Sequence, residues 1–378
     1  MGCITSKPFK HIKIDYEKPK TLVCFNNGKF GDFYVNNKNL YTFTKGLNLK
    51  NKSNSYRTIC KEVKVFDLPI NKYIITALDI YRDKLNVYIE MPKYHQTLLT
   101  YTDNNNGLMT NESIDVINNI TRGLKYLHDN EIIHNDIKPS NILLNDTTDS
   151  CVLADFGFNN ELGICGTYGY IAPEKYNGYT DYYNDIWSLG ITMLHCISNS
   201  SVIDILCYNN SVSPDKASDF TYEEMFKFYI NPNPILVHLL MNMLKTNTDI
   251  RYSIEDICIH PLLIPGIEKI HHKDTVLIID DDPVHLKILA QKMKMKNINV
   301  HTSNCVMNAS YLLSLNKYDC IISDLYMPIV NGNELHEMIN LPNFHLISAY
   351  ENIDYYDVIL KSDFNKLIRI VYSDFEIM

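Results

Sequence analysis

The sequence of 378 residues has no apolar run that approaches the roughly 20 residues a membrane-spanning helix needs. Its strongest run, ILVHLLMNML at 235–244, is half that length and contains His238. Cysteine pairs at metal-ligand spacing are also lacking, and no secretory signal precedes the ten cysteines, so we expect reduced thiols in a cytosol-facing compartment. Positive charge is not in excess, and the formal net charge of −9 argues against general nucleic-acid binding. Any membrane contact must therefore come from an anchor.

The composition is that of an ordinary soluble globular chain, with 46% hydrophobic and 21% charged residues. At a prior of about 150 residues per domain, the length predicts two domains. Strand-like segments come first, between residues 21 and 45, and helical spacing takes over from about residue 113. A new alternation of strands and helices opens with VLIID at 276–280, which places the domain boundary near residues 266–274.

The first residues, MGCITSKPFK, fit the N-myristoylation pattern, which requires Gly at position 2 and Ser or Thr at position 6. Gly2 and Ser6 satisfy it, and Cys3 is a suitable palmitoyl acceptor. The alternative is a chance match in a disordered terminus, since the pattern fixes few positions. We predict that residues 1–20 form a lipidated segment that holds the chain at the cytoplasmic face of a membrane, and that the chain is otherwise cytoplasmic.

Three motifs in order carry the chemistry of the first domain: IIHNDIKPSNILL, LADFGF and GTYGYIAPE. With these motifs the sequence resembles the protein kinase family over about residues 21–266. By that resemblance, Asp136 supplies the carboxylate that accepts the substrate hydroxyl proton, and Asn141 and Asp155 supply oxygens that hold Mg²⁺. The resemblance implies a bilobal protein kinase fold with a small β-rich lobe, a larger α-helical lobe, and MgATP between them.

The same resemblance implies the class of acceptor. Lys138, two residues beyond Asp136, matches the serine/threonine kinases, in which this Lys contacts the transferred phosphoryl group and a Thr, here Thr167, helps hold it. We therefore expect a non-specific serine/threonine protein kinase that uses ATP and Mg²⁺ to phosphorylate Ser and Thr hydroxyls of protein substrates. Its small and large lobes are expected at 21–92 and 93–266.

The turn that approaches the ATP phosphates departs from the family pattern at one position. Gly28, Phe30 and Gly31 match its second Gly, aromatic tip and third Gly, whereas Asn26 stands where the first Gly should be. Asn tolerates positive φ better than most residues, so the turn is compatible with this change. The residues expected to contact the nucleotide are Phe25, Asn26, Asn27, Gly28, Lys29, Phe30, Gly31, Asp32, Phe33, Lys45, Glu62, Glu90 and Met91.

Lys45 in FTK and Glu62 in CKEVKVF are placed as the ion pair that positions the α- and β-phosphates, with a solvated helix charge as the alternative for Glu62. The segment VYIEMP is the expected hinge beside the adenine, with Ile89 at the back of the pocket. Pro92 lies where a backbone N–H would donate to the base, and Pro has none, so weaker ATP binding is expected.

Activation-loop phosphorylation is not the expected switch. Asn135 replaces the Arg that binds the activation-loop phosphate in many kinases, and the segment 157–165, GFNNELGIC, contains no Ser, Thr or Tyr. Two further matches to the family are structural. Asp185 is expected to brace the catalytic loop, and Arg251 is expected to pair with Glu174.

The second domain, about 275–378, opens with a strand that ends in an acidic cluster, Asp280, Asp281 and Asp282, and contains a later strand, CIISD, that ends at Asp324. These features resemble response-regulator receiver domains. In that family, carboxylates at the carboxyl ends of parallel strands hold Mg²⁺, which neutralises charge as the residue at the position of Asp324 attacks a phosphoryl group. The resemblance implies a doubly wound, flavodoxin-like α/β fold, with Asp280, Asp281 and Asp324 as metal ligands and Asp324 as the phosphoacceptor.

Two further receiver positions are assigned from the same resemblance. Ser348 in HLISAY matches the Ser or Thr that follows the phosphoryl group. The family has Lys-Pro after its fifth strand, and KLIRIVY here offers Arg369 as the switch cation and Lys366 at the aromatic switch position. The alternatives are an acidic turn without chemistry and a degenerate receiver used only for docking. Residues 267–274 are expected to be a linker.

Together these features predict a membrane-anchored serine/threonine protein kinase fused to a receiver domain that accepts phosphate on Asp324 and modulates the kinase. The sequence contains no histidine-kinase motif, so the phosphodonor would be another protein or a small molecule. Two alternatives are kept, a pseudokinase scaffold and a phosphorelay binding module in which the kinase fold only presents the receiver.

Overall fold

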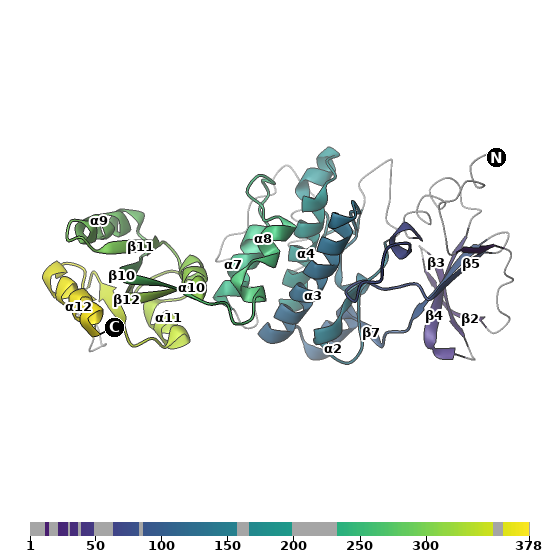
Figure 1. The fold of residues 1–378 in the computed structure, drawn as a ribbon, viewed down its shortest axis with the longest axis horizontal. Helices are drawn as coiled ribbons and strands as arrows, with labels where there is room; N and C mark the ends of the chain where they lie inside the picture. Colours follow the sequence, from purple (N-terminus) through teal and green to yellow (C-terminus); the bar gives the residue numbers. More distant parts are fainter. Residues whose placement is uncertain are drawn as a thin grey trace. The chain divides into compact units, whose positions relative to one another are not determined.

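The computed structural model describes residues 12–14, 22–28, 31–36, 39–48, 63–82, 86–156, 166–198, 233–350 and 358–377. These residues fall into two compact units. Unit 1 contains the described residues up to 198 together with 242–258, and unit 2 contains 233–241 together with those from 259 onward. In Figure 1, unit 1 runs from purple to teal and unit 2 from green to yellow, apart from the green stretch 242–258.

A six-stranded sheet forms the amino-terminal part of unit 1 (Figure 1). Its strands follow the order β1-β5-β6-β4-β3-β2, and neighbours are antiparallel except for the parallel pair β1 and β5. Three of them, β2 to β4, form the hairpin and third strand that the sequence predicts. The strands are β1 (Ile12–Ile14), β2 (Leu22–Gly28), β3 (Gly31–Asn36), β4 (Asn39–Asn48), β5 (Asp79–Arg82) and β6 (Asn86–Pro92).

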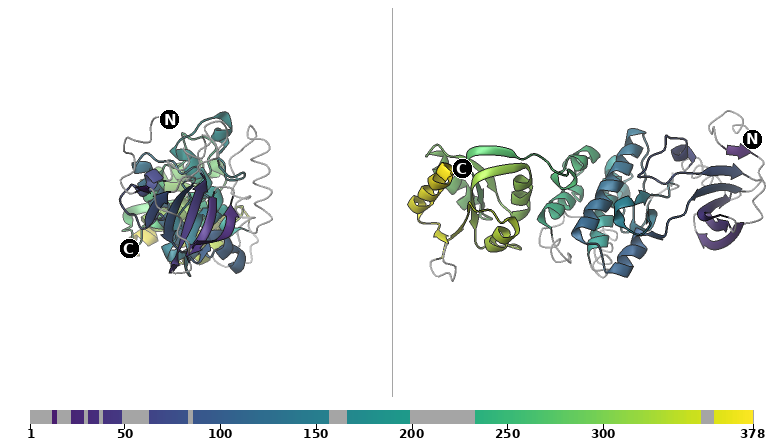
Figure 2. Two further views of the ribbon diagram at one scale, coloured as in Figure 1. Left: turned by 90° about the vertical axis from the view of Figure 1, so that its right-hand side faces the viewer. Right: turned by 60° about the horizontal axis from the view of Figure 1, so that its bottom comes forward.

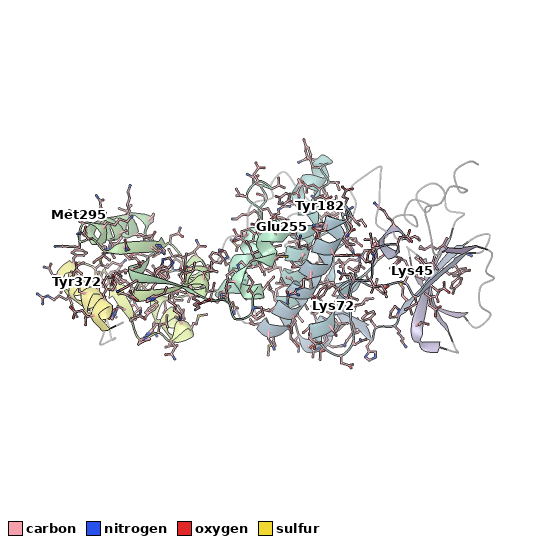
Figure 3. All side chains as sticks on the ribbon, in the orientation of Figure 1. Lys45, Lys72, Tyr182, Glu255, Met295 and Tyr372 are labelled. Atoms are coloured by element: carbon pink, nitrogen blue, oxygen red, sulfur yellow. The ribbon has the colours of Figure 1, made fainter. Side chains whose placement is uncertain are left out.

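The register of this sheet positions the predicted phosphate-contacting segment. Gly28 pairs with Gly31 at the end of the β2–β3 hairpin, so the chain reverses direction between two glycines. Strand β4 pairs with β3 on one side and β6 on the other, and Lys45 lies opposite Phe33 and Ile89 (Figure 3 labels Lys45). Main-chain hydrogen bonds on both sides therefore hold Lys45 in place.

Two helices, α3 (Thr110–Asp129) and α4 (Tyr182–Ile197), pack against each other in the helical part of unit 1 (Figures 1 and 2). Helix α3 begins where the Glu112 carboxylate accepts from the backbone N–H of Met109 at 2.8 Å, which satisfies one of the free donors of the first turn. Most of its apolar side is buried, as the 3.6-residue spacing predicts, and the fully buried residues there are Val116, Ile117, Ile120, Leu124 and Leu127. No described helix is both long enough and apolar enough to cross a membrane.

Short elements precede α3, join α3 to α4 and follow α4. Strands β7, β8 and β9 form a small antiparallel sheet beneath the catalytic loop segment. The elements are β7 (Gln96–Thr97), α2 (Leu98–Asn105), η1 (Pro139–Asn141), β8 (Ile142–Leu144), η2 (Thr148–Ser150), β9 (Val152–Leu153), η3 (Pro173–Asn177) and α8 (Ile254–Cys258).

Unit 2 is built around a five-stranded parallel sheet in the order β11-β10-β12-β13-β14. Helices α9 and α12 cover one face and share one hydrophobic core with the strands. Helix α10 contacts β10, β11 and β12, and helix α11 contacts β13. The strands are β10 (Ile270–Ile279), β11 (Asn299–Ser303), β12 (Asn316–Asp324), β13 (Phe344–Ser348) and β14 (Ile359–Leu360). The helices are α9 (Pro283–Lys294), α10 (Val306–Leu315), α11 (Gly332–Ile339) and α12 (Phe364–Ile377), preceded by α7 (Pro234–Met243), whose last residues lie in unit 1, and η5 (Pro261–Leu263).

Strand β10 begins earlier than the sequence predicts. Residues Ile270 to His272 pair with the start of β12, the register then shifts before Val276, and His271 lies 2.6 Å from the Asp319 carboxylate. Residues 270–274 therefore belong to the sheet of unit 2, and the predicted linker 267–274 is too long at its carboxyl end.

Candidate functional site

Asp136, Lys138 and Thr167 form a closed hydrogen-bonded set in unit 1. Lys138 Nζ donates to Asp136 Oδ2 at 2.8 Å and to Thr167 Oγ1 at 2.6 Å, and the Thr167 hydroxyl donates to Asp136 Oδ1 at 2.6 Å. Asp136 is buried, while the Lys138 side chain is 17% exposed. The structure thus brings together a carboxylate that can accept a proton and a cation that solvent, and hence a substrate, can reach.

Asp185 of α4 holds the backbone just before Asp136. Its two carboxylate oxygens each accept a backbone N–H at 2.8 Å, one from His134 and one from Asn135, and His128 Nε2 lies 3.0 Å away. Burial alone would raise the pKa of this fully buried carboxyl, but the hydrogen bond and charge of His128 lower it below its ordinary value. The group therefore stays ionised and braces the loop.

Asn141 and Asp155 present oxygens beside this set. The side-chain Nδ2 of Asn141 donates to the backbone oxygen of Asp136 at 2.8 Å and to Asp136 Oδ2 at 3.0 Å. Neither of these two bonds uses the side-chain oxygen of Asn141. The backbone N–H of Ala154 donates to the Asn141 carbonyl at 2.9 Å, which brings the residue preceding Asp155 next to η1. An amide oxygen and a carboxylate are hard ligands that fit Mg²⁺.

Asp155 also contacts the strand lysine. Lys45 Nζ lies 2.8 Å from Asp155 Oδ1, and the Lys45 side chain is 4% exposed. Burial alone would raise the pKa of Asp155, but the charge and hydrogen bond of Lys45 lower it. Asp155 has a φ of 66°, a left-handed backbone conformation that few residues other than Gly, Asn, Asp and His adopt and that concentrates at functional sites.

Phe156 anchors this segment in the core. It is fully buried, and its ring packs edge-on against Phe66 at 6.0 Å and His134 at 5.4 Å between ring centroids. Phe66 belongs to the helical residues 63–66. Packing between three distant segments therefore sets the direction in which the neighbouring Asp155 points.

A contact that the sequence did not predict ties Asn135 to η3. Lys175 Nζ donates to Asn135 Oδ1 at 2.9 Å, and both residues are buried. Asn135 has a φ of 72°, which Asn adopts more easily than most residues. Gly166 packs closely on the backbone carbonyl of Asn135, and a Cβ added to Gly166 would lie 3.1 Å from that oxygen. The residue at the usual phosphate-binding position thus bonds a lysine of the chain itself.

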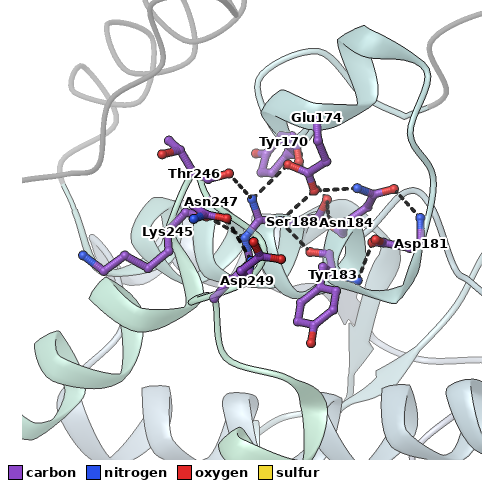
Figure 4. Close-up of polar contacts among 11 residues, drawn as sticks. Tyr170, Glu174, Asp181, Tyr183, Asn184, Ser188, Lys245, Thr246, Asn247 and Asp249 are labelled. Carbon is purple, nitrogen blue, oxygen red and sulfur yellow. Dashed lines mark hydrogen bonds and ion pairs between the residues drawn. The ribbon is translucent and has the colours of Figure 1, made fainter.

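Glu174 and Arg251 form the predicted pair (Figure 4 shows Glu174 and its neighbours). The guanidinium makes two parallel bonds to the carboxylate, of 2.7 and 2.9 Å, and Asn184 donates to the same carboxylate at 2.6 Å. Arg251 also lies over the Trp187 ring, 5.0 Å from its centroid. The pair lies in the interior and, through its hydrogen bonds to Asn184 and the Tyr183 carbonyl, fixes the start of η3 against α4.

Only part of the predicted nucleotide site falls within the described residues. Positions 25–28 and 31–33 lie in β2 and β3 beside the hairpin turn. Lys29, Phe30 and Glu62, like Gly2 and Cys3, lie outside the described residues. The Lys45–Glu62 pair and the lipidation sites therefore remain predictions.

The predicted hinge lies at the end of β6. Ile89 is fully buried, and Met91 is buried as well. Glu90 accepts a hydrogen bond from the Thr42 hydroxyl at 2.7 Å, and Pro92, the last residue of the strand, lies opposite Thr42. The strand therefore continues through the segment that is expected to pass the adenine.

In unit 2, carboxylate oxygens of Asp280, Asp281 and Asp324 lie within 4.8 Å of one another at the carboxyl ends of β10 and β12. Asp282 is not part of this group, because its side chain caps α9 by accepting from the backbone N–H groups of Val284 and His285. Three carboxylates at this spacing fit Mg²⁺, which prefers oxygen ligands. The metal ligands predicted for the second domain therefore meet.

The cation at this cluster is Lys361, and the prediction of Arg369 was wrong. Lys361 Nζ lies 2.8 Å from both Asp280 Oδ2 and Asp324 Oδ2. Arg369 and Lys366 are exposed residues of α12. The fifth strand has only two residues, Ile359 and Leu360. The lysine that directly follows VIL in the sequence is the feature that could have identified this cation.

The charges around Asp324 shift two pKa values. Burial raises the pKa of the Asp324 carboxyl, and the Asp280 charge adds to the rise, against the lowering effect of Lys361. Burial alone would lower the pKa of Lys361, but its hydrogen bonds to Asp280 and Asp324 raise it. Ser348 is fully buried at the end of β13, and its backbone carbonyl accepts from the N–H of Lys361 at 2.7 Å.

Two family models match the chain. The protein kinase domain model matches residues 27–263, and the response regulator receiver domain model matches residues 276–369. Their order agrees with the two domains that the sequence predicts, and the parallel sheet of unit 2 agrees with a flavodoxin-like receiver.

Relatives with known names are protein kinases. The DNA damage response protein kinase DUN1 of Saccharomyces cerevisiae is 32% identical over 186 residues, 41% of this chain and 35% of that protein. Serine/threonine-protein kinase PLK2 of Mus musculus is 26% identical over 228 residues, 57% of this chain and 32% of that protein. An Aurora kinase of Yarrowia lipolytica is 26% identical over 267 residues, 66% of this chain and 68% of that protein. The chain spans about a third of the length of the first two.

Proposed function

The chain belongs to the protein kinase family, and we propose that it transfers the γ-phosphoryl group of ATP to serine and threonine hydroxyls of proteins. The observation that carries this proposal is the set of Asp136, Lys138 and Thr167, joined by hydrogen bonds of 2.6 to 2.8 Å. Relatives named as serine/threonine-protein kinases support the choice of acceptor.

Each residue of the set has a separate task in the proposed transfer. Asp136 accepts the proton of the substrate hydroxyl, and Lys138 donates hydrogen bonds to the phosphoryl oxygens while Thr167 keeps its ammonium beside Asp136. Asn141 and Asp155 would hold Mg²⁺, which supplies charge neutralisation for the phosphates when bound. Lys45 on β4, buried against Asp155, would hold the α- and β-phosphates near the Gly28–Gly31 hairpin.

The acceptor is tested with three peptides that differ only in the acceptor residue. We expect purified full-length protein with MgATP to label the Ser and Thr peptides at least tenfold faster than the Tyr peptide, because Lys138 and Thr167 occupy the loop as in serine/threonine kinases. Preferred labelling of the Tyr peptide would contradict the acceptor class. Absence of transfer to all three and to protein mixtures would favour a scaffold without activity.

We propose in addition that Asp324 accepts a phosphoryl group and that this changes the rate of the kinase. Asp324 attacks the phosphorus of a small phosphodonor such as acetyl phosphate, acetate leaves, and Lys361 neutralises the added charge. Lys361→Met is expected to lower aspartyl-phosphate yield at least tenfold by removing this cation. The matched variant Arg369→Met, on the exposed side of α12, should label like the wild type.

These variants are compared by radiolabelling with acetyl phosphate and Mg²⁺, followed by kinase assays. Equal labelling of the wild type and Lys361→Met would contradict the role of Lys361. Equal kinase rates with and without confirmed phosphorylation of Asp324 would remove the proposed coupling. The same assay shows whether phosphorylation of Asp324 raises or lowers the kinase rate.

A lipid anchor is proposed for the chain that begins at Met1. One myristoyl chain binds membranes only marginally, with an association constant of about 10⁴ M⁻¹, so a second signal is needed. Cys3 supplies one as a palmitoyl acceptor, and Lys7, Lys10 and Lys13 supply another near anionic lipids. We expect the intact chain to sediment with membranes and Gly2→Ala to remain in the supernatant. Identical fractionation of the two would refute the anchor.

A further inference from the structure

Three side chains with metal-binding atoms meet in unit 2, away from the Asp280–Asp324 cluster. Cys320 comes from β12, His345 from β13 and Asp374 from α12. One ligand atom of each, the Cys sulfur, a His nitrogen and a carboxylate oxygen, lies within 4.8 Å of the other two. No sequence motif joins these residues, and nothing in the proposed kinase or receiver chemistry uses them.

The positions of these residues are ones that the fold otherwise fills with apolar side chains. Cys320 and Ile322 alternate along β12 toward the face covered by α12, and His345 lies opposite Ile322 in the neighbouring strand. Along α12, Leu367 and Val371 pack into the same core, and Asp374 follows at the spacing that keeps one helix face inward (Figure 1 shows α12 beside β12). Polar groups at core-facing positions break the local pattern, and such breaks concentrate at functional sites.

Burial gives this cluster the properties of a ligand set. The Cys320 thiol is fully buried, whereas the side chains of His345 and Asp374 are 23% and 14% exposed. His345 Nε2 lies 2.7 Å from Asp374 Oδ2. Solvent reaches the cluster from the His345 and Asp374 side.

We propose that Cys320, His345 and Asp374 bind one Zn²⁺ ion, with water as the fourth ligand. Binding releases the thiol proton to solvent as the metal–sulfur bond forms, and the thiolate and carboxylate then balance the two charges of the ion. Tetrahedral Zn²⁺ with these ligands needs donor atoms roughly 3.4 to 3.6 Å apart. The three donors lie within 4.8 Å of one another, and the His345–Asp374 contact of 2.7 Å would have to open by about 0.7 Å to admit the ion.

The ligand types separate this site from the carboxylate cluster around Asp324. Sulfur, imidazole nitrogen and a single carboxylate favour Zn²⁺ or Co²⁺, while Mg²⁺ prefers oxygen ligands in octahedral geometry. The bound ion would join two neighbouring strands to α12. Metal binding would thus clamp α12 onto the sheet and stabilise unit 2 against unfolding, since the site exists only in the folded chain.

The test uses metal-free full-length protein and Co²⁺ as a spectroscopic substitute for Zn²⁺. We expect one equivalent of Co²⁺ to produce a thiolate-to-cobalt charge-transfer band and the visible bands of tetrahedral Co²⁺. Cys320→Ser should abolish the charge-transfer band, and Asp374→Asn should weaken Co²⁺ binding by roughly tenfold or more. Cys305→Ser, a matched change at a partly exposed cysteine of the same unit, and Asp324→Asn should leave the band intact.

A second measurement needs no variant and therefore does not depend on their folding. X-ray absorption of the Zn²⁺-loaded wild type should give one sulfur at about 2.3 Å and nitrogen or oxygen neighbours at about 2.0 to 2.2 Å. The proposal is overturned if the wild type shows no stoichiometric thiolate band, if folded Cys320→Ser keeps it, or if the zinc spectrum contains no sulfur neighbour. The kinase and receiver proposals are unaffected by any of these results.

Discussion

Replacing Asp136 by Asn is expected to lower the rate of phosphoryl transfer by about 10³-fold, within the range of loss typical of a general acid–base group. Asn has nearly the same shape as Asp, but an amide does not accept the hydroxyl proton. It also removes the negative charge that holds Lys138 Nζ at 2.8 Å. Two elements of the proposed chemistry, the base and the position of the phosphoryl-contacting cation, are therefore lost in one substitution.

The effect should fall on kcat for the peptide and not on KM for ATP. The contact of Lys45 with Asp155 does not involve Asp136, so the nucleotide side of the site is retained. Asp146→Asn is the matched control, because this carboxylate is 85% exposed and contacts only a surface histidine among the described ion pairs. Retention of more than a tenth of wild-type kcat by folded Asp136→Asn would argue against Asp136 as the base.

The sequence predicts best those parts of the site whose functional residues lie within a few positions of one another in one motif. Asp136, Lys138 and Asn141 lie on one short loop, so their spacing along the chain limits where their side chains can go. The brace by Asp185 and the pair of Glu174 with Arg251 were also anticipated, since the resemblance to the kinase family supplied partners far apart in the sequence. The order of strands and then helices follows from a change in apolar period, whereas the division into two lobes is what the resemblance implies.

The contacts that were missed depend on tertiary packing. Lys361 follows a two-residue strand that is too short for a clear alternating pattern, so the sequence predicted the cation later in the chain, in KLIRIVY. Cys320, His345 and Asp374 come from three elements and have no fixed spacing. The start of β10 at Ile270 depends on pairing with β12 and on the irregular register at His272, neither of which composition reveals.

The bond between Lys175 and Asn135, forty positions apart, links the catalytic loop to η3 through two side chains of the chain itself. In kinases with Arg at this position, a phosphate neutralises the guanidinium. Here the neutral amide of Asn135 accepts from a buried ammonium, and the segment 157–165 has no hydroxyl to phosphorylate. The contact therefore provides a fixed link between the loop that carries Asp136 and the η3 segment.

Asn135→Arg is accordingly expected to inactivate the kinase, with kcat at least tenfold lower and the folded state destabilised by about 3 kcal/mol or more, because it buries a second cation against Lys175. Asn135→Asp keeps an acceptor at hydrogen-bond distance and should retain activity within a factor of about three. The stability of both variants is measured by denaturant unfolding. Peptide phosphorylation is then assayed at a temperature at which both variants are folded.

Comparing the two variants shows whether activity depends on the hydrogen bond to Lys175 or is lost with any substitution at position 135. If Asn135→Asp loses as much activity as Asn135→Arg, activity does not depend on a hydrogen-bond acceptor at this position. Phosphatase treatment and a phosphopeptide map of the wild type supply the second arm. Activity that falls with loss of a phosphate from residues 157–168 would show that the kinase is switched there after all, and that the Lys175–Asn135 bond does not replace the phosphate.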